Sequence, residues 1–182
     1  MDEQLEFMKI VAHRLDAAGI PYMLTGSLAM TFYATPRMTR DVDVVVELSP
    51  QDTARFSKQF TDDCYVDGSS VDDAVSHRGM FNIINNQSIV KVDFIVRKAD
   101  SYHETEFARR RYIEVDGFRV AVVSPEDLIL SKLLWAKDSG SATQQDDVIR
   151  LMRTIRNLDW SYLEKWASAL GIAQELRQVR SK

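Results

Sequence analysis

Three aspartates at two places in the chain could hold a divalent cation. Asp41 and Asp43 flank Val42 at the start of an apolar run, and Asp93 interrupts a second apolar run between residues 90 and 96. Because side chains alternate along a strand, Asp41 and Asp43 point the same way about 7 Å apart and repel each other unless water or a cation lies between them. Mg²⁺ prefers oxygen ligands, usually one or two carboxylates together with substrate phosphates. The aspartates therefore predict a Mg²⁺ site. The alternatives are a solvated strand face for the Asp-x-Asp pair and an edge position for Asp93.

A Gly26-Ser27 pair lies between an apolar segment and an expected helix, and thirteen residues separate it from Asp41. A glycine there lets a phosphate approach the backbone closely, and the helix that follows presents free N–H groups. Ser27 adds a hydroxyl donor. The pair predicts a phosphate-binding turn, and an ordinary turn with a helix cap is the alternative.

Helices and strands must position these groups. Helical spacing of apolar residues predicts a first helix over residues 2–18, and β-branched residues predict a strand over 41–47. Asp116-Gly117 is typical of a two-residue hairpin turn. We expect further strands over 22–25, 80–84, 89–96, 112–115 and 118–123, and helices over 28–33, 50–60 and 101–110, with a loop and a short helix in 62–79.

The pattern changes at Ser124. Ser124-Pro125-Glu126-Asp127 predicts a capped helix start, and further helices fit residues 143–155, 159–170 and 172–180. The predicted fold class is α+β, a mixed sheet flanked by helices. We expect an α/β core over residues 1–123 and a C-terminal helical region over 124–182, packed together as one unit.

Composition excludes several classes of protein. The chain has 182 residues, a net charge of −4, 45% hydrophobic residues and the single cysteine Cys64. It is too apolar for a disordered chain and lacks the run of about 20 apolar residues that a membrane helix needs. Its acidic start is unlike a secretory signal, and one cysteine allows no internal disulfide. We expect a soluble cytoplasmic protein without a thiol nucleophile.

The combination of Gly26-Ser27, Asp41-x-Asp43 and Asp93 on a later strand resembles the signature of the nucleotidyltransferase (DNA polymerase β-like) superfamily. Ser124-Pro125-Glu126-Asp127-Leu128, followed by Lys132 and Asp146-Asp147, further resembles the small bacterial branch related to AbiEii toxins. The resemblance spans about residues 5–155 and implies a nucleotidyltransferase-like mixed sheet. Gly-Ser stands where many relatives have Gly-Gly.

This resemblance implies a role for each site residue. Asp41, Asp43 and Asp93 would be the catalytic and metal-binding residues, holding Mg²⁺ or alternatively Mn²⁺. The nucleotide would be bound by Gly26, Ser27, Arg40, Lys132 and Asp147. For Arg40, orientation of Asp41 is an alternative; Lys132 could instead extend its ammonium group to solvent, and Asp147 could pair with Lys132.

Two other groups of residues receive a structural interpretation. Trp135, Trp160 and Trp166 are expected in the core of the helical region rather than as base-stacking surfaces. The basic run Arg109-Arg110-Arg111 is expected at a solvated edge, with RNA phosphate contact as the less favoured reading.

The predicted function is therefore metal-dependent transfer of a nucleoside monophosphate from an NTP to a hydroxyl. The acceptor would be RNA such as tRNA, protein or a small molecule. The resemblance also suggests a toxin or phage-defence setting with a cognate antitoxin, and no membrane partner. The alternatives are a non-catalytic nucleotide-binding or interaction module with the same fold and a kinase-like phosphotransferase.

Overall fold

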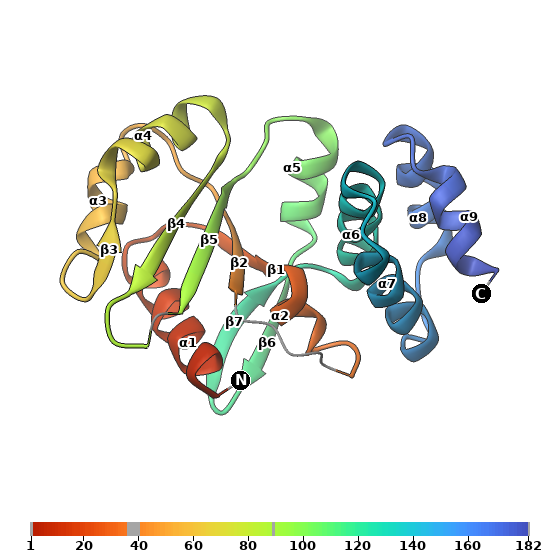
Figure 1. Cartoon of the computed structure of the whole chain (residues 1–182), viewed down its shortest axis with the longest axis horizontal. Helices are drawn as coiled ribbons and strands as arrows, with labels where there is room; N and C mark the ends of the chain where they lie inside the picture. Colours follow the sequence, from red (N-terminus) through yellow and green to blue (C-terminus); the bar gives the residue numbers. More distant parts are fainter. Residues whose placement is uncertain (1, 36–40, 89, 182) are drawn as a thin grey trace.

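The computed structural model of the chain describes residues 2–35, 41–88 and 90–181 (Figure 1). Its strands are β1 (Tyr22–Thr25), β2 (Asp41–Val46), β3 (Cys64–Val66), β4 (Met80–Asn85), β5 (Lys91–Val96), β6 (Arg111–Val115) and β7 (Phe118–Val122). Its helices are α1 (Asp2–Ala17), α2 (Gly26–Met30), α3 (Thr53–Lys58), α4 (Gly68–His77), α5 (Ser101–Ala108), α6 (Pro125–Ser139), α7 (Ala142–Thr154), α8 (Trp160–Ala169) and α9 (Ala173–Arg180).

The strands form one mixed seven-stranded sheet in the order β3-β4-β5-β2-β1-β7-β6. The pairs β2–β5 and β1–β7 are parallel, and the other neighbours are antiparallel. This confirms the predicted α+β class with a mixed sheet flanked by helices.

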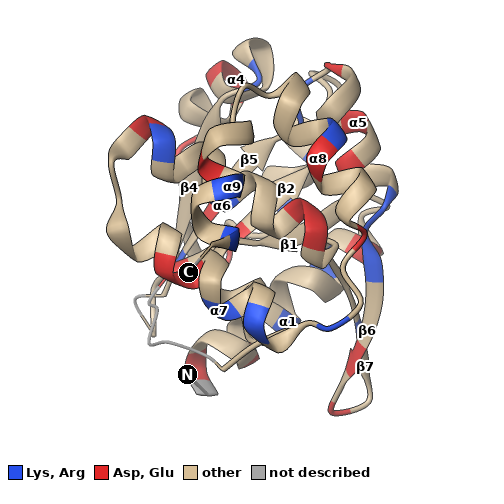
Figure 2. Ribbon diagram, turned by 90° about the vertical axis from the view of Figure 1, so that its right-hand side faces the viewer, with Lys and Arg blue, Asp and Glu red and all other residues tan. Residues whose placement is uncertain are grey.

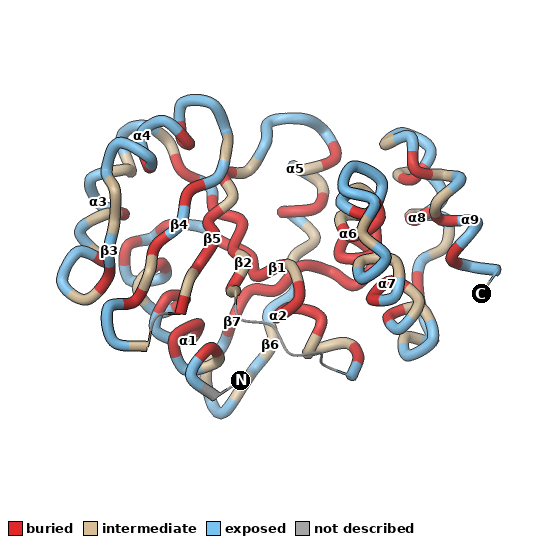
Figure 3. Tube along the Cα trace, in the orientation of Figure 1, coloured by how far each residue is buried: buried red, intermediate tan, exposed pale blue. Residues whose placement is uncertain are grey.

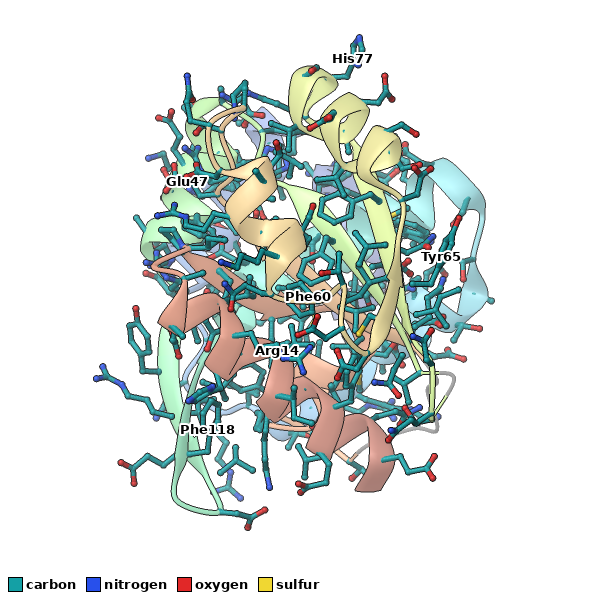
Figure 4. The ribbon with its side chains drawn as sticks, turned by 90° about the vertical axis from the view of Figure 1, so that its left-hand side faces the viewer. Arg14, Glu47, Phe60, Tyr65, His77 and Phe118 are labelled. Atoms are coloured by element: carbon teal, nitrogen blue, oxygen red, sulfur yellow. The ribbon has the colours of Figure 1, made fainter. Side chains whose placement is uncertain are left out.

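Helices cover the sheet on both sides. Helices α1, α3 and α4 lie together over one face (Figure 4), and the C-terminal helices α6 to α9 lie on the other side of the molecule (Figure 1). The inner strands β1, β2 and β5 are mostly buried (Figure 3). Four phenylalanines pack together under α3, with ring centroids 4.9–5.9 Å apart: Phe56, Phe60, Phe81 and Phe94.

Alternation along β2 and β5 separates this core from the site. Val42, Val44 and Val46 are fully buried, as are Val92 and Phe94 in β5. Since side chains alternate in a strand, Asp41, Asp43 and Asp93 point to the opposite face. The apolar residues between the aspartates thus anchor the strands and fix the direction of the carboxylates.

Capping and turn residues explain where several helices and strands begin and end. The Ser124 hydroxyl caps α6 by accepting a hydrogen bond from the Asp127 amide. Asp116 and Gly117, at φ 49° and 77°, form the predicted turn between β6 and β7. The expected loop and short helix over residues 62–79 instead contain β3 and the ten-residue α4, because Cys64–Val66 pairs with β4 as an edge strand.

An ion-pair cluster joins α6 to the rest of the chain. The Arg109 guanidinium donates to Glu126 and Asp127, and the Tyr162 hydroxyl donates to Asp127 over 2.6 Å. Arg109 also lies over the Tyr162 ring, 3.8 Å from its centroid. The expected solvated edge is therefore wrong for Arg109, which links residues before α6 to α6 and α8.

The surface of the C-terminal helices carries both charges. Figure 2 shows Lys and Arg interspersed with Asp and Glu along α7, α8 and α9. No helix in the described residues has the length and apolar character needed to span a membrane.

Candidate active site

The parallel pairing of β2 and β5 brings the three predicted aspartates to one face of the sheet. Asp43 lies directly beside Asp93, and Asp41 beside Lys91. Paired residues on adjacent parallel strands point to the same face. β5 is an interior strand between β4 and β2, so the edge alternative for Asp93 is wrong.

A lysine lies among these carboxylates. Lys91 Nζ is 2.8 Å from Asp93 Oδ2 and 3.7 Å from Asp41 Oδ1. Hydrogen bonding to Asp93 raises the pKa of the Lys91 ammonium, so it stays charged at neutral pH. Lys91 therefore offsets part of the negative charge of the cluster, a contact that sequence reasoning missed.

Gly26 packs directly against Asp43. Thr25 pairs with Asp43 across β1 and β2, so the next residue turns over the carboxylate. Gly26 has φ +65°, and a Cβ there would lie 1.9 Å from Asp43 Oδ2. Both the backbone conformation and the contact demand glycine. The helix expected over residues 28–33 is the five-residue α2, which begins at Gly26 itself.

Asp43 lies in an environment that disfavours its charged form. Burial, followed by the charges of Asp93 and Asp41, raises the pKa of Asp43 to about 6. The ammonium groups of Lys132 and Lys91 act in the opposite direction. A further positive charge near Asp43 would therefore be stabilising.

A pocket of about 160 Å³ opens beside Asp43, between the sheet and α6. The sheet side contributes Thr25, Gly26, Ser27, Asp43 and Ile95. The helical side contributes Ser131, Lys132, Trp135 and Gln144. Gly26, Ser27 and Lys132, which the sequence assigned to one nucleotide site, thus line a single cavity.

Lys132 is held inside this wall. Its Nζ donates to Asp147 Oδ2 over 2.8 Å and to Gln144 Oε1 over 3.0 Å. Lys132 and Asp147 are both buried, so the alternative in which Lys132 extends to solvent is wrong, whereas the Lys132–Asp147 pair is present. Asp147 is not among the residues that line the pocket, and it contacts Lys132, which is.

The predictions for Arg40 and Trp135 remain to be compared with the structure. Arg40 lies outside the described residues. Trp135 was expected in the core but is 59% exposed, because it lies on α6 at the pocket, one turn beyond the half-buried Ser131. Trp135 and Gln144 are pocket residues that the spacing of motifs did not indicate.

The donor set is suited to a hard cation, although the carboxylates do not form a closed cage. Asp41, Asp43 and Asp93 supply only oxygen atoms, the donors that Mg²⁺ prefers. Within the described ranges, no three His, Cys, Asp or Glu side chains gather closely enough to enclose a metal ion. The Lys91 ammonium contacts Asp41 and Asp93, so a cation at these carboxylates would compete with it.

Solved structures share this fold. A nucleotidyltransferase-like protein from Paracoccidioides brasiliensis is 20% identical with a TM-score of 0.61, over 98% of this chain and 92% of that one. A nucleotidyltransferase from Thermotoga maritima is 15% identical with a TM-score of 0.55, over 80% and 92%. The lincosamide antibiotic adenylyltransferase LnuA is 11% identical with a TM-score of 0.55, over 85% and 98%. At these identities the likeness concerns the fold.

Comparison of the sequence with curated proteins and with family models identifies the family. No curated protein matches the chain significantly. The model of one family, described as nucleotidyltransferases of unknown function (DUF6036), matches residues 1–180. With almost its whole length matched and its fold shared by nucleotidyltransferase-like structures, the chain belongs to the DUF6036 nucleotidyltransferase family.

Proposed function

We propose that this protein transfers a nucleoside monophosphate from an NTP to a hydroxyl acceptor and releases pyrophosphate. The observation that carries the proposal is that Gly26 packs against Asp43 and that Asp43 lies beside Asp93 on the neighbouring strand. It combines a backbone turn without a side chain, which a phosphate can approach, with carboxylates on the same face. The family and the adenylyltransferase LnuA, which has the same fold, support this class of reaction.

The reaction places distinct demands on the residues. The acceptor oxygen bonds to the α-phosphorus, the bond to the oxygen that bridges the α- and β-phosphates breaks, and pyrophosphate leaves. Asp93 is the group proposed to take the hydroxyl proton. Gly26 and Ser27 would bind the phosphates, and Lys132 would contribute positive charge at the helical wall of the pocket.

Asp41, Asp43 and Asp93 are the residues proposed to hold Mg²⁺ or Mn²⁺. When bound, the divalent ion would neutralise phosphate charge and align the triphosphate for attack. The protein's own contribution is to hold three carboxylates on adjacent rigid strands and to keep space beside Asp43 through Gly26.

Incubation with α-³²P-labelled NTPs and Mg²⁺ tests this proposal. We expect label transfer and pyrophosphate release by the wild type, and loss of both in an Asp41→Asn/Asp43→Asn double variant. Asp138→Asn/Asp146→Asn, which removes two exposed carboxylates, is the matched control and should retain activity. Label transfer that survives in the double variant would overturn the metal assignment.

A second candidate is a nucleotide-binding module that performs no transfer. The contact of Lys91 with Asp93 favours it, because an ammonium group already neutralises part of the cluster. This function would be selected if calorimetry detects NTP binding and the transfer assay detects no pyrophosphate release. Release of ADP instead of pyrophosphate would indicate phosphotransfer.

The acceptor and the biological setting are further proposals. Bulk RNA including tRNA, the protein itself and small polyhydroxylated molecules are separate arms of the same label-transfer assay. A toxin role predicts growth arrest on expression, relieved by a cognate antitoxin and absent in the Asp41→Asn/Asp43→Asn variant.

A further inference from the structure

Trp135 occupies an unusual place for a tryptophan in this chain. Trp160 and Trp166 pack against the hydrophobic core, whereas Trp135 is 59% exposed. It lines the pocket from α6, one turn beyond Ser131. A large aromatic surface that is exposed to water at a cavity is typical of a ligand-binding site, whereas single exposed apolar residues elsewhere on a protein surface are common.

The helix that carries Trp135 is firmly held. Leu128, Ile129 and Leu133 on α6 are fully buried. On the pocket side, the Lys132 ammonium ties α6 to Gln144 and Asp147 of α7. The indole therefore projects from a rigid support, so little backbone freedom would be lost when a ligand packs on it.

The pocket is lined by both polar and apolar groups. Gly26, Ser27 and Asp43 provide polar groups and close backbone access at the sheet. Trp135 provides a flat apolar surface at the helical wall, and Ile95 adds apolar surface from β5. A ligand that matches both kinds of surface has a charged, oxygen-rich part and a planar part.

We propose that the Trp135 indole is the stacking surface for the base of the bound nucleoside triphosphate. This inference rests on the proposed function, which places the triphosphate at Gly26 and Ser27. Stacking accepts any base, since every base has a π-face, and it is stronger for the larger purines. Trp135 would thus add affinity that does not depend on the phosphates and favour purine nucleotides.

Calorimetry with two probes tests the assignment. The full-length wild type, Trp135→Ala and Trp135→Phe are titrated with α,β-methylene ATP and with inorganic tripolyphosphate, both with Mg²⁺. We expect Trp135→Ala to weaken the ATP analogue about 5- to 150-fold, the range for loss of one base–aromatic stack. Its affinity for tripolyphosphate should not change, and Trp135→Phe should restore most of the affinity for the ATP analogue.

Tyr112→Ala is the matched control, because Tyr112 is an exposed aromatic residue on β6, outside the pocket. It should bind both probes as the wild type does. In the wild type, the ATP analogue should also quench tryptophan fluorescence, and Trp135→Phe should abolish that quenching.

The outcomes separate this inference from the proposed function. Wild-type affinity for the ATP analogue in Trp135→Ala overturns the stacking role, even if nucleotidyl transfer is observed. Equal weakening for both probes also overturns it, because the effect would then concern the phosphate end. If the wild type binds neither probe, both the stacking role and the proposed function fail.

Discussion

Lys91 Nζ lies 2.8 Å from Asp93 Oδ2, so the sheet face that carries the candidate site also contains its own cation. The contact follows from alternation along β5, which puts Lys91 and Asp93 on the same face, and the register with β2 places Lys91 beside Asp41 as well. An ammonium group and a divalent ion compete for the same carboxylate oxygens. Lys91 would therefore weaken the binding of the proposed metal ion.

Replacement of Lys91 by methionine should strengthen the response to Mg²⁺. Without the ammonium group the carboxylates repel one another, so we expect stability without metal to fall by about 1 kcal/mol, as for a partly exposed ion pair. The rise in melting temperature on adding Mg²⁺ should exceed that of the wild type. Lys58→Met, on α3, is the control. Equal Mg²⁺-dependent shifts in all three proteins would show that Lys91 does not compete with the metal.

Gly26→Ala should damage the site more than Gly19→Ala. Both glycines have positive φ, so each substitution costs about 1–2 kcal/mol of backbone strain. At Gly19 a Cβ meets no atom within 4 Å, whereas at Gly26 it would lie 1.9 Å from Asp43 Oδ2. Asp43 must therefore move in Gly26→Ala alone.

Urea denaturation and calorimetry of NTP binding measure the two effects separately. We expect Gly19→Ala to lose stability but retain nucleotide affinity, and Gly26→Ala to lose both. If the two variants bind NTP equally well, the turn at Gly26 has no role in the site.

The predictable part of the site follows from alternation along strands. Val42 and Val44 indicate which side of β2 is buried, so the direction of Asp41 and Asp43 could be read directly from the sequence. The spacing between Gly26 and these aspartates predicted that the phosphate-binding turn would lie beside them.

Contacts that depend on register or on helix packing could not be predicted in this way. Lys91 approaches Asp41 only because β5 pairs with β2 in one of several possible registers. The apolar residues of α6 surround much of the helix, so periodicity did not reveal that Trp135 would be exposed. Arg109 belongs to a basic run that looks solvated until α6 and α8 pack beside it.

Arg109→Met should destabilise the fold more than the substitution of a partly exposed residue usually does. Glu126 and Asp127 are almost completely buried, and both accept hydrogen bonds from Arg109. Removal of Arg109 takes away the cation nearest to both carboxylates but leaves the hydroxyl of Tyr162 on Asp127, so we expect a loss of about 3 kcal/mol, the lower end of the range for buried pairs.

Urea denaturation provides the comparison, with Arg55→Met as the control. Arg55 pairs with Asp52 at an exposed position, and its replacement should cost less than about 1 kcal/mol. Similar losses in the two variants would mean that the Arg109 cluster contributes no more than a surface ion pair.

Glu106 should make the protein less stable as the pH rises. Burial, with the nearby charges of Asp127 and Asp100, raises the pKa of Glu106 in α5 to about 8. In the unfolded chain the carboxyl group ionises at an ordinary pKa of about 4.3. Between these values the unfolded state binds fewer protons than the folded state, so stability decreases with rising pH by up to about 1.4 kcal/mol per pH unit.

Glu106→Gln keeps the shape of the side chain and removes its titration. We expect the variant to match the wild type near pH 5 and to be clearly more stable at pH 8, with a flatter dependence between them. Glu104→Gln, an exposed neighbour on the same helix, should follow the wild-type curve. Urea denaturation at pH 5, 6.5 and 8 measures all three proteins. Parallel curves for the wild type and Glu106→Gln would show that Glu106 ionises normally in the folded protein, with water or a local rearrangement offsetting its burial.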